Sequence, residues 1–217
     1  MGRDKALLEL AGKPLVLRAV EKLRRVCAEV SIVGNRAELG AYAPLVRDLH
    51  EGCGPLGGIE AALLHSAKDW NLFMAVDMPF LPVGFLNAWV RRVTGDASAR
   101  VALFTVDGRP QPALCLLHKD VAPFVSGAVT RGEFKLFAVL VEAGKELAAR
   151  QGREFDEVFL NLPWSNVLPS VDAFDEDGAG WAPTAAQRGG MHLWFANLNT
   201  PDEFAEAAAV AGVLETD

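Results

Sequence analysis

Apolar residues recur along the chain with two alternating spacings. Where they return every three or four residues the pattern predicts a helix, and a short apolar run between turn residues predicts a strand. Helices are predicted over 14–26, 56–67, 83–93, 119–126 and 133–149, and in the segment after Thr200. Strands are predicted over 29–34, 45–49, 71–76, 100–106, 112–117, 155–160 and 192–196.

This alternation of strands with helices predicts an α/β fold with a mostly parallel sheet and helices on both faces. The run 71–76, NLFMAV, is apolar almost without interruption, which is typical of a strand buried on both faces. A chain of 217 residues can bury a substantial core. We therefore expect a single domain over residues 1–217.

One stretch, 161–191, departs from the alternation. It contains Pro163, Pro169 and Pro183, together with the acidic sequence DEDGAG at 175–180. We predict a long surface loop here, and the sequence suggests no role for it.

Composition and charge narrow the class of protein. Hydrophobic residues make up 51% and charged residues 23%, which suits a folded globular chain. The net charge of −7 gives no overall field to attract nucleic acid, although a small phosphate can still be bound locally. No apolar run is long enough to span a bilayer. Three cysteines without a C-x-x-C pair favour a reducing, cytoplasmic location.

The opening, MGRDKALL followed by GKPL at 12–15, is the strongest candidate for chemistry. A glycine and a lysine ahead of an amphipathic helix suit a polyphosphate, because backbone N–H groups can cradle it and the ammonium can neutralise it. Read alone, a lysine near a chain start is more often a solvated surface residue.

A second candidate is GPLGGI at 54–59. Proline fixes the turn, and the glycines allow the backbone to approach a ligand or another element closely. An ordinary turn from a loop into a helix explains the same residues equally well.

Asp77 follows the apolar strand 71–76, at the carboxyl end where open α/β sheets bind ligands. A carboxylate at this place can hold Mg²⁺ that bridges phosphates. The alternative is a cap for the next helix, which Pro79 and Pro82 make less favourable because they delay that helix.

A fourth candidate is the sequence NLNTP, in which Asn197 and Asn199 are two positions apart and so point the same way on an extended segment. Their carbonyl oxygens can complete a metal shell or hydrogen-bond a substrate. Thr200 is expected to be the N-cap of the last helix, and capping is the alternative role for Asn199.

Taken together, these motifs resemble the molybdenum-cofactor guanylyltransferases of the MobA family, within the wider superfamily of NTP transferases. The resemblance runs through nearly the whole chain: MGxDKALL, GKPL, GPLGGI, a strand ending in D-x-P, the pair QP at 111–112, and NxNTP before the last helix. It implies a three-layer, Rossmann-like nucleotidyltransferase that moves GMP from GTP to molybdopterin with Mg²⁺ and releases pyrophosphate.

The resemblance also implies roles on the phosphate side of the nucleotide. Gly2 and Lys5 match the positions that contact the GTP phosphates, and Asp77 matches the metal-binding aspartate. Asn199 and Asn197 match asparagines near the metal and the molybdopterin phosphate. Lys5, Asp77 and Asn199 are thereby the candidate catalytic residues, with Asp77 and Asn199 as candidate metal ligands.

On the nucleoside side, the resemblance places Asn35 near the guanine or ribose and Asp48 on the nucleotide. Gly54, Pro55 and Gly57 match positions that shape the wall beside the guanine. Further partners that the family implies are molybdenum-insertion proteins and apo-molybdoenzymes, and we expect a monomer.

Two other functions stay open. A related nucleotidyltransferase could use CTP or another acceptor, although GPLGGI and NxNTP favour GTP. A protein of a different class would carry molybdopterin without catalysis, and it would not depend on Asp77 for binding the pterin.

The chain departs from the family at its start. Members normally carry L-A-G-G-x-S-x-R, the first strand and Gly-rich loop, before M-G-x-D-K, and Met1 takes the place of that methionine. We expect that the natural protein is longer and that its start was assigned too late. A true truncation, giving an inactive relative or a partner subunit, is the alternative. Without the strand, the given chain is expected to be marginally stable and short of phosphate donors.

Overall fold

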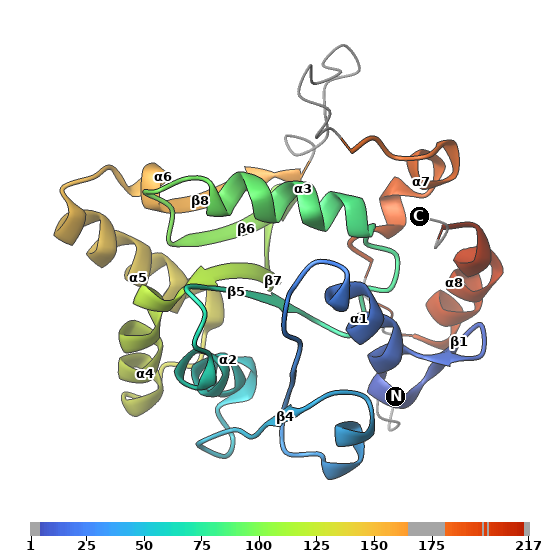
Figure 1. Cartoon of the computed structure of the whole chain (residues 1–217), viewed down its shortest axis with the longest axis horizontal. Helices are drawn as coiled ribbons and strands as arrows, with labels where there is room; N and C mark the ends of the chain where they lie inside the picture. Colours follow the sequence, from blue (N-terminus) through green and yellow to red (C-terminus); the bar gives the residue numbers. More distant parts are fainter. Residues whose placement is uncertain (1–4, 165–180, 197, 199, 215–217) are drawn as a thin grey trace. The chain divides into compact units, whose positions relative to one another are not determined.

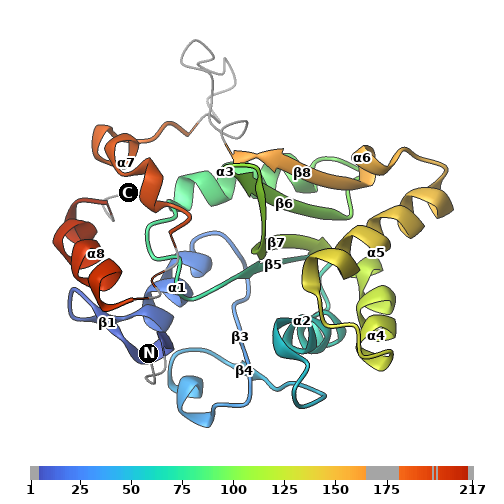
Figure 2. The same ribbon diagram turned by 180° about the vertical axis from the view of Figure 1, so that it is seen from behind.

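The computed structural model describes residues 5–164, 181–196, 198 and 200–214, in which helices and strands alternate (Figures 1 and 2). The helices are α1 (Leu15–Arg24), α2 (Gly54–His65), α3 (Val83–Thr94), α4 (Ala122–Thr130), α5 (Leu136–Gln151), α6 (Phe155–Val158), α7 (Ala185–Gly189) and α8 (Pro201–Leu214). The strands are β1 (Glu9–Leu10), β2 (Lys13–Pro14), β3 (Ile32–Val33), β4 (Leu45–Val46), β5 (Trp70–Met74), β6 (Val101–Val106), β7 (Arg109–His118) and β8 (Phe159–Pro163). Short 3₁₀ helices are η1 (Lys5–Leu7), η2 (Ala37–Ala41), η3 (Lys119–Val121) and η5 (Met191–Leu193).

Residue contacts divide the chain into two compact units. Unit 1 consists of Met1–Val30, Met74–Arg91 and Ser165–Asp217, and unit 2 consists of Ser31–Phe73 and Arg92–Trp164. The expectation of a single domain stays a prediction.

The main sheet has the strand order β5-β7-β6-β8 and is mixed. Strand β8 runs parallel to β6, with Val101 opposite Phe159, whereas β7 runs antiparallel to β6, with Val101 opposite Leu117. The predicted α/β fold is therefore confirmed, with a main sheet that is mixed and not purely parallel.

The antiparallel pairing of β6 with β7 follows from the two residues that join them. Asp107 and Gly108 have φ angles of 49° and 74°, the left-handed region that a tight two-residue hairpin requires. Asp-Gly is among the sequences that adopt this turn most readily, because glycine has no Cβ and aspartate tolerates positive φ. A hairpin this short can only join antiparallel strands.

Unit 2 contains one large hydrophobic core between the strands β6, β7 and β8 and the helices α2, α4 and α5. Leu103 and Leu117 from the sheet meet Val125 and Leu140 from the helices, and all four are fully buried. Figure 2 shows these three helices beside the sheet. The periodic apolar faces of predicted helices 56–67, 119–126 and 133–149 are what build this core.

Unit 1 has a smaller core in which α8 packs beside the β1–β2 hairpin (Figure 1). Leu10, Leu15, Phe80, Ala207 and Ala211 are buried there. The last helix confirms the prediction for the segment after Thr200. Thr200 Oγ1 accepts a hydrogen bond from the Glu203 amide at 3.2 Å, so Thr200 caps the helix as expected.

The predicted strand over 192–196 is wrong, because this segment forms η5 and a turn. Trp194 and Phe195 both lie against Phe85, with ring centroids 5.5 Å and 5.9 Å away. Neighbouring side chains on a strand point to opposite faces, so a strand could not bring both rings onto one partner. The aromatic packing explains why the backbone turns here.

The prediction over 155–160 is wrong for its first half, where α6 forms. Glu154 and Glu157 make a capping box, in which each side chain accepts a hydrogen bond from the other residue's backbone N–H. Strand β8 starts only at Phe159. An E-x-x-E spacing was therefore the local signal that outweighed the apolar pattern.

The stretch 161–191, predicted as a loop, contains the end of β8 and helix α7. Thr184 and Gln187 form a second capping box at the start of α7. The loop prediction is wrong at these two places, and residues 165–180 lie outside the described residues.

Strand β5 is half-buried at every position and not buried on both faces as predicted. Within the described sheet it stands at one end of the strand order, next to β7 only. In the described part of the chain, no helix is long and apolar enough to cross a membrane.

Candidate functional site

Lys5 and Asp77, which are 72 positions apart in the sequence, form an ion pair in unit 1. The Lys5 ammonium nitrogen lies 3.2 Å from Asp77 Oδ2, and the side chains are 34% and 16% exposed. Lys5 opens the short helix η1, and Asp77 follows β5. The structure thus brings together the two charged residues that the sequence assigned to the phosphate side.

The backbone of Asp77 also contacts the NLNTP segment. The Leu198 amide donates a hydrogen bond of 3.3 Å to the Asp77 carbonyl oxygen. Leu198 stands between the two asparagines in the sequence, and the bond holds the backbone of Leu198 next to Asp77. The side chains of Asn197 and Asn199 lie outside the described residues, as does Gly2, and their assigned roles stay predictions.

Asp77 does not cap the helix that follows it. Helix α3 begins at Val83, six positions later, beyond Pro79 and Pro82. A capping side chain bonds to the first turn of its own helix, within about three residues. The alternative role considered for Asp77 is therefore wrong, and its carboxylate is placed beside a lysine instead.

The carboxylate of Asp77 is the kind of ligand that binds Mg²⁺ together with a substrate. In the described residues, no group of three or more histidine, cysteine, aspartate or glutamate side chains could hold a metal. Mg²⁺ commonly binds through one or two carboxylates together with substrate phosphates and water. Asp77 can supply one such carboxylate oxygen, and the remaining ligands would come from phosphates.

In unit 2, Asn35 and Asp48 are joined by two hydrogen bonds. The Asp48 amide donates to Asn35 Oδ1 at 3.1 Å, and Asn35 Nδ2 donates to Asp48 Oδ2 at 3.4 Å. Asn35 is exposed and Asp48 is half-buried. The structure therefore brings together the two residues that the sequence assigned to the nucleoside side.

The parallel strands β3 and β4 explain why this pair forms. Ile32 is opposite Leu45 and Val33 is opposite Val46. Asn35 and Asp48 both follow the carboxyl ends of their strands, and parallel strands place those ends at the same edge. Open α/β sheets bind ligands at such edges.

The glycines of GPLGGI make close approaches within unit 2. A Cβ on Gly58 would lie 2.7 Å from Val33 Cγ1 and 3.5 Å from Asp48 Oδ1, and one on Gly57 would lie 2.8 Å from Cys53 Cβ. Gly54, with φ of +56°, opens helix α2 in a left-handed conformation, and Pro55 follows in the first turn. The approach of the backbone to another element is thus confirmed, whereas a wall beside guanine built by Gly54, Pro55 and Gly57 stays a prediction.

Sequence reasoning did not single out Gly58, although it stands in the same motif. It is the residue that lets α2 pack onto β3 beside Asp48. Sequence reasoning also did not consider the spacing of the cations Arg18, Lys22 and Arg25, which follow one face of α1 to the residue that caps it.

Comparisons with known proteins show the family of the chain. The family model of the MobA-like NTP transferase domain matches residues 1–151. A protein of Serratia proteamaculans named molybdenum cofactor guanylyltransferase is 34% identical over 159 residues, covering 70% of this chain and 78% of that protein. A protein of the same name from Vibrio cholerae is 33% identical over 145 residues, covering 65% of this chain and 70% of that protein.

Solved structures show the fold. A molybdopterin-guanine dinucleotide biosynthesis protein A from Archaeoglobus fulgidus superposes with a TM-score of 0.66 at 23% identity, covering 97% of this chain and 92% of that one. A 2-C-methyl-D-erythritol 4-phosphate cytidylyltransferase from Thermus thermophilus superposes with a TM-score of 0.54 at 16% identity, covering 96% and 94%. Both show that the chain has the Rossmann-like fold of nucleotidyltransferases. With the family model matched over more than half its length, the chain belongs to the MobA-like NTP transferases.

Proposed function

We propose that this chain transfers GMP from GTP to molybdopterin, forming the guanine dinucleotide of the molybdenum cofactor. Its family is one of nucleotidyltransferases, and relatives at 34% identity are named molybdenum cofactor guanylyltransferases. The observation that carries the proposal is the Lys5–Asp77 ion pair of 3.2 Å, with the NLNTP backbone hydrogen-bonded to Asp77.

The reaction needs a group that neutralises phosphate charge but no base. An oxygen of the terminal molybdopterin phosphate attacks the α-phosphorus of GTP and forms a new P–O bond. The bond from the α-phosphorus to the bridging oxygen breaks, and pyrophosphate leaves with the electron pair. The attacking phosphate is already an anion at neutral pH, so positioning and charge neutralisation carry the catalysis.

In this proposal Lys5 binds the phosphates of GTP, because a compact ammonium matches the charge of phosphate oxygens. Asp77 holds the ammonium in the absence of substrate and supplies a carboxylate oxygen for Mg²⁺ when the metal is bound with GTP. The metal would neutralise charge that builds on the phosphate oxygens. Asn199 and Asn197 are proposed to act beside Asp77 on the metal and the molybdopterin phosphate.

We assign Asn35 and Asp48 to the nucleoside of GTP. Guanine presents N1–H and N2–H₂ as neighbouring donors, and one carboxylate can accept from both. Cytosine presents only its N4–H₂ donors on that edge. The two hydrogen bonds with Asn35 fix Asp48 in place, which favours selection between the bases.

The expected cellular location, oligomeric state and protein partners follow from the same proposal. We expect a cytoplasmic location, which the free cysteines Cys27, Cys53 and Cys115 support. A monomer, and contacts with molybdenum-insertion proteins and apo-molybdoenzymes, stay predictions.

The test is to incubate the full chain with molybdopterin, Mg²⁺ and either GTP or CTP, and to identify the pterin product by mass spectrometry. We expect the guanine dinucleotide and pyrophosphate. Formation of the cytosine dinucleotide in its place would make the chain a cytidylyltransferase. Retention of molybdopterin with no product from either nucleotide, unchanged by Asp77→Asn, would identify a non-catalytic carrier.

A further inference from the structure

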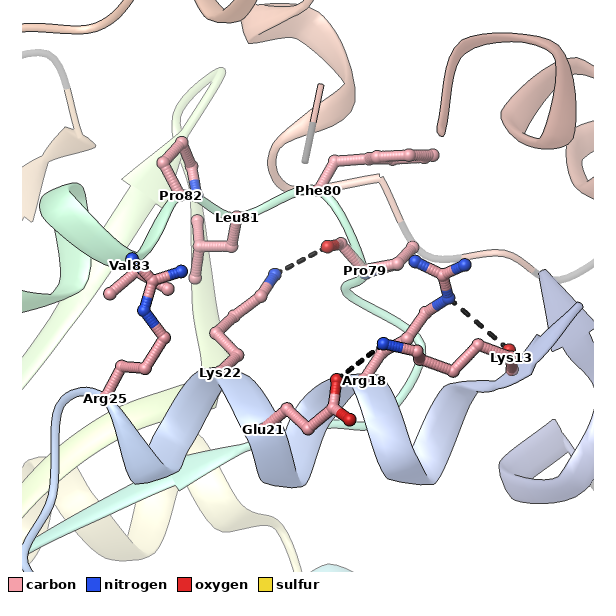
Figure 3. A pocket seen from close by; sticks show the side chains of 10 residues that line it. All are labelled: Lys13, Arg18, Glu21, Lys22, Arg25, Pro79, Phe80, Leu81, Pro82 and Val83. Carbon is pink, nitrogen blue, oxygen red and sulfur yellow. Dashed lines mark hydrogen bonds and ion pairs between the residues drawn. The ribbon is translucent and has the colours of Figure 1, made fainter. Parts of the chain in front are cut away.

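A hollow of about 200 Å³ in unit 1 lies between helix α1 and the segment 79–83 (Figure 3). Neither Lys5 nor Asp77 lines it. Its size is many times the roughly 15 Å³ of comparable volume that holds one water. The hollow can therefore take a small ligand, and it is not part of the site assigned to the transfer reaction.

Positive charge gathers around this hollow. Its lining includes the cations Lys13, Arg18, Lys22 and Arg25 and one carboxylate, Glu21. Among the described residues of the lining, four positive charges stand against one negative charge, whereas the whole chain carries −7. A local excess of this kind attracts anions even to an acidic protein.

Three of the cations follow one face of α1, the last of them at the residue that caps its C-terminus. Arg18, Lys22 and Arg25 stand at positions i, i+4 and i+7, which follow each other along one side of a helix. Figure 3 shows their side chains rising from α1 toward the segment 79–83. Like charges at this spacing repel each other and weaken a helix. The pattern is therefore unfavourable for the helix alone, and an anion among these groups would relieve the repulsion.

Contacts with the backbone hold two of these cations in position. Arg18 is only 7% exposed, and its Nε donates to the Leu10 carbonyl oxygen at 3.0 Å. The Lys22 ammonium donates to the Pro79 carbonyl oxygen at 2.5 Å. A carbonyl oxygen accepts a hydrogen bond from a cation without carrying a formal charge, so these bonds orient the two side chains.

The single carboxylate of the lining is engaged by a cation. The Lys13 ammonium lies 2.7 Å from Glu21 Oε2, and both side chains are more than two-fifths exposed. This pair offsets the negative charge nearest the hollow.

From this charge, size and geometry we propose that the hollow binds a small phosphate-bearing anion with two or more negative charges. Guanidinium and ammonium groups both form charge-assisted hydrogen bonds with phosphate oxygens. A space of about 200 Å³ suits a phosphate or pyrophosphate group and not a folded partner. The proposal does not depend on the transfer reaction, because the two sets of residues are separate.

The experiment measures binding of inorganic pyrophosphate and of inorganic phosphate to the full chain by calorimetry. Divalent metal is removed and the ionic strength is fixed, so that a metal-dependent nucleotide site contributes little. We expect pyrophosphate to bind more tightly than phosphate because it carries more charge. If neither pyrophosphate nor phosphate binds, the proposal is overturned.

Two arginines side by side on α1 provide a matched pair of variants. Arg25→Gln removes a charge that lines the hollow, and we expect it to weaken pyrophosphate binding about tenfold or more. Arg24→Gln makes the same change at an exposed residue outside the lining, and we expect less than about a twofold effect. Equal losses in both variants would show a general effect of charge and would contradict a site here.

A third variant separates the hollow from the candidate nucleotide site. With divalent metal removed, Lys22→Gln should weaken pyrophosphate binding more than Lys5→Gln does. Loss of binding in Lys5→Gln would place the pyrophosphate at Lys5 and overturn the proposal. Circular dichroism of each variant checks that the fold is kept, and both Arg24 and Arg25 are exposed, so their replacement should not disturb the core.

Discussion

The two pairs of candidate site residues differ in how firmly each is held. Lys5 and Asp77 in unit 1 carry opposite charges and meet through one contact of 3.2 Å between flexible side chains. Asn35 and Asp48 in unit 2 are joined by two hydrogen bonds, one of which involves backbone. A charged pair can exchange its contact for a phosphate or a metal, whereas a fixed pair presents the same atoms to every ligand. On the proposed function, the Lys5–Asp77 pair would supply charge for the chemistry and the Asn35–Asp48 pair would supply selection.

The elements around the two pairs also differ. Asn35 and Asp48 follow two parallel strands on which α2 packs closely through Gly58. Lys5 and Asp77 lie on short segments, a 3₁₀ helix and a turn that follows β5. Selection between similar ligands requires a rigid arrangement of atoms, and the close packing of α2 on β3 beside Asp48 favours it.

The largest effect is expected from Asp77→Asn. The change removes the carboxylate charge next to Lys5 and the proposed metal ligand while keeping the side chain's shape. We expect the rate of guanylyl transfer to fall about 100-fold or more, with little change in stability. A steady-state assay of pyrophosphate release measures it.

Asp156→Asn is the matched control, because Asp156 is an exposed aspartate of α6. It should leave the rate within about twofold. If Asp77→Asn behaves like this control, Asp77 has no part in the transfer reaction.

A smaller effect is expected when the contact between α2 and β3 is disturbed. Gly58→Ala would place a Cβ 2.7 Å from Val33 Cγ1, on a β-branched side chain with little rotational freedom. Alanine favours a helix over glycine by about 1 kcal/mol, and overpacking costs about 1–3 kcal/mol. We therefore expect a net loss of up to about 2 kcal/mol in the free energy of unfolding, measured with urea.

Two further variants sharpen this result. Gly189→Ala is the control, since a Cβ there meets nothing within 4 Å. Adding Val33→Ala to Gly58→Ala should recover part of the loss specific to Gly58. Equal stability of Gly58→Ala and Gly189→Ala would show that α2 is not held tightly on β3.

The smallest effect concerns His118, whose side chain caps η3. Its Nδ1 accepts a hydrogen bond from the Asp120 amide at 3.3 Å, which requires an unprotonated nitrogen. The pKa of His118 lies below its ordinary value of 6.5, chiefly because burial disfavours the charged ring. The Asp120 carboxylate, 3.1 Å away, opposes this lowering and the Arg100 guanidinium adds to it.

A lowered pKa in the folded state means that the unfolded chain takes up this proton first as the pH falls. The contribution of His118 to stability is therefore complete above pH 6.5 and is lost as the pH falls through its folded pKa. His118→Asn keeps a side chain that caps well but does not titrate. We expect the free energy of unfolding, measured with urea, to fall less in this variant than in the wild type between about pH 7 and pH 5. An equal fall in both proteins would contradict this role.

Much of unit 2 could be predicted from sequence, because its helices have periodic apolar faces and pack on one core. The predicted helix 56–67 corresponds to α2, Gly54–His65, and the strands 100–106 and 112–117 correspond to β6 and β7. The direction of β7 was missed, although Asp107-Gly108 is a strong hairpin signal.

Other features depend on contacts between distant residues and could not be predicted from local patterns. Trp194 and Phe195 adopt a turn because both pack on Phe85, which is more than 100 positions away. The half-burial of β5 depends on its place in the sheet and not on its own apolar sequence. Family resemblance assigned Lys5 and Asp77 to the phosphate side of the nucleotide, but their ion pair was not predicted, since no spacing rule connects residues 72 positions apart.

The most direct test of this division of roles is the ratio of kcat/KM for GTP to that for CTP. It is measured on the wild type, Asp77→Asn and Asp48→Asn with molybdopterin as acceptor. We predict that the wild type prefers GTP, that Asp77→Asn slows both nucleotides and keeps the ratio, and that Asp48→Asn lowers the ratio about tenfold or more. A ratio that Asp48→Asn leaves unchanged, or that both variants lower equally, would contradict the assignment of selection to unit 2 and charge to unit 1.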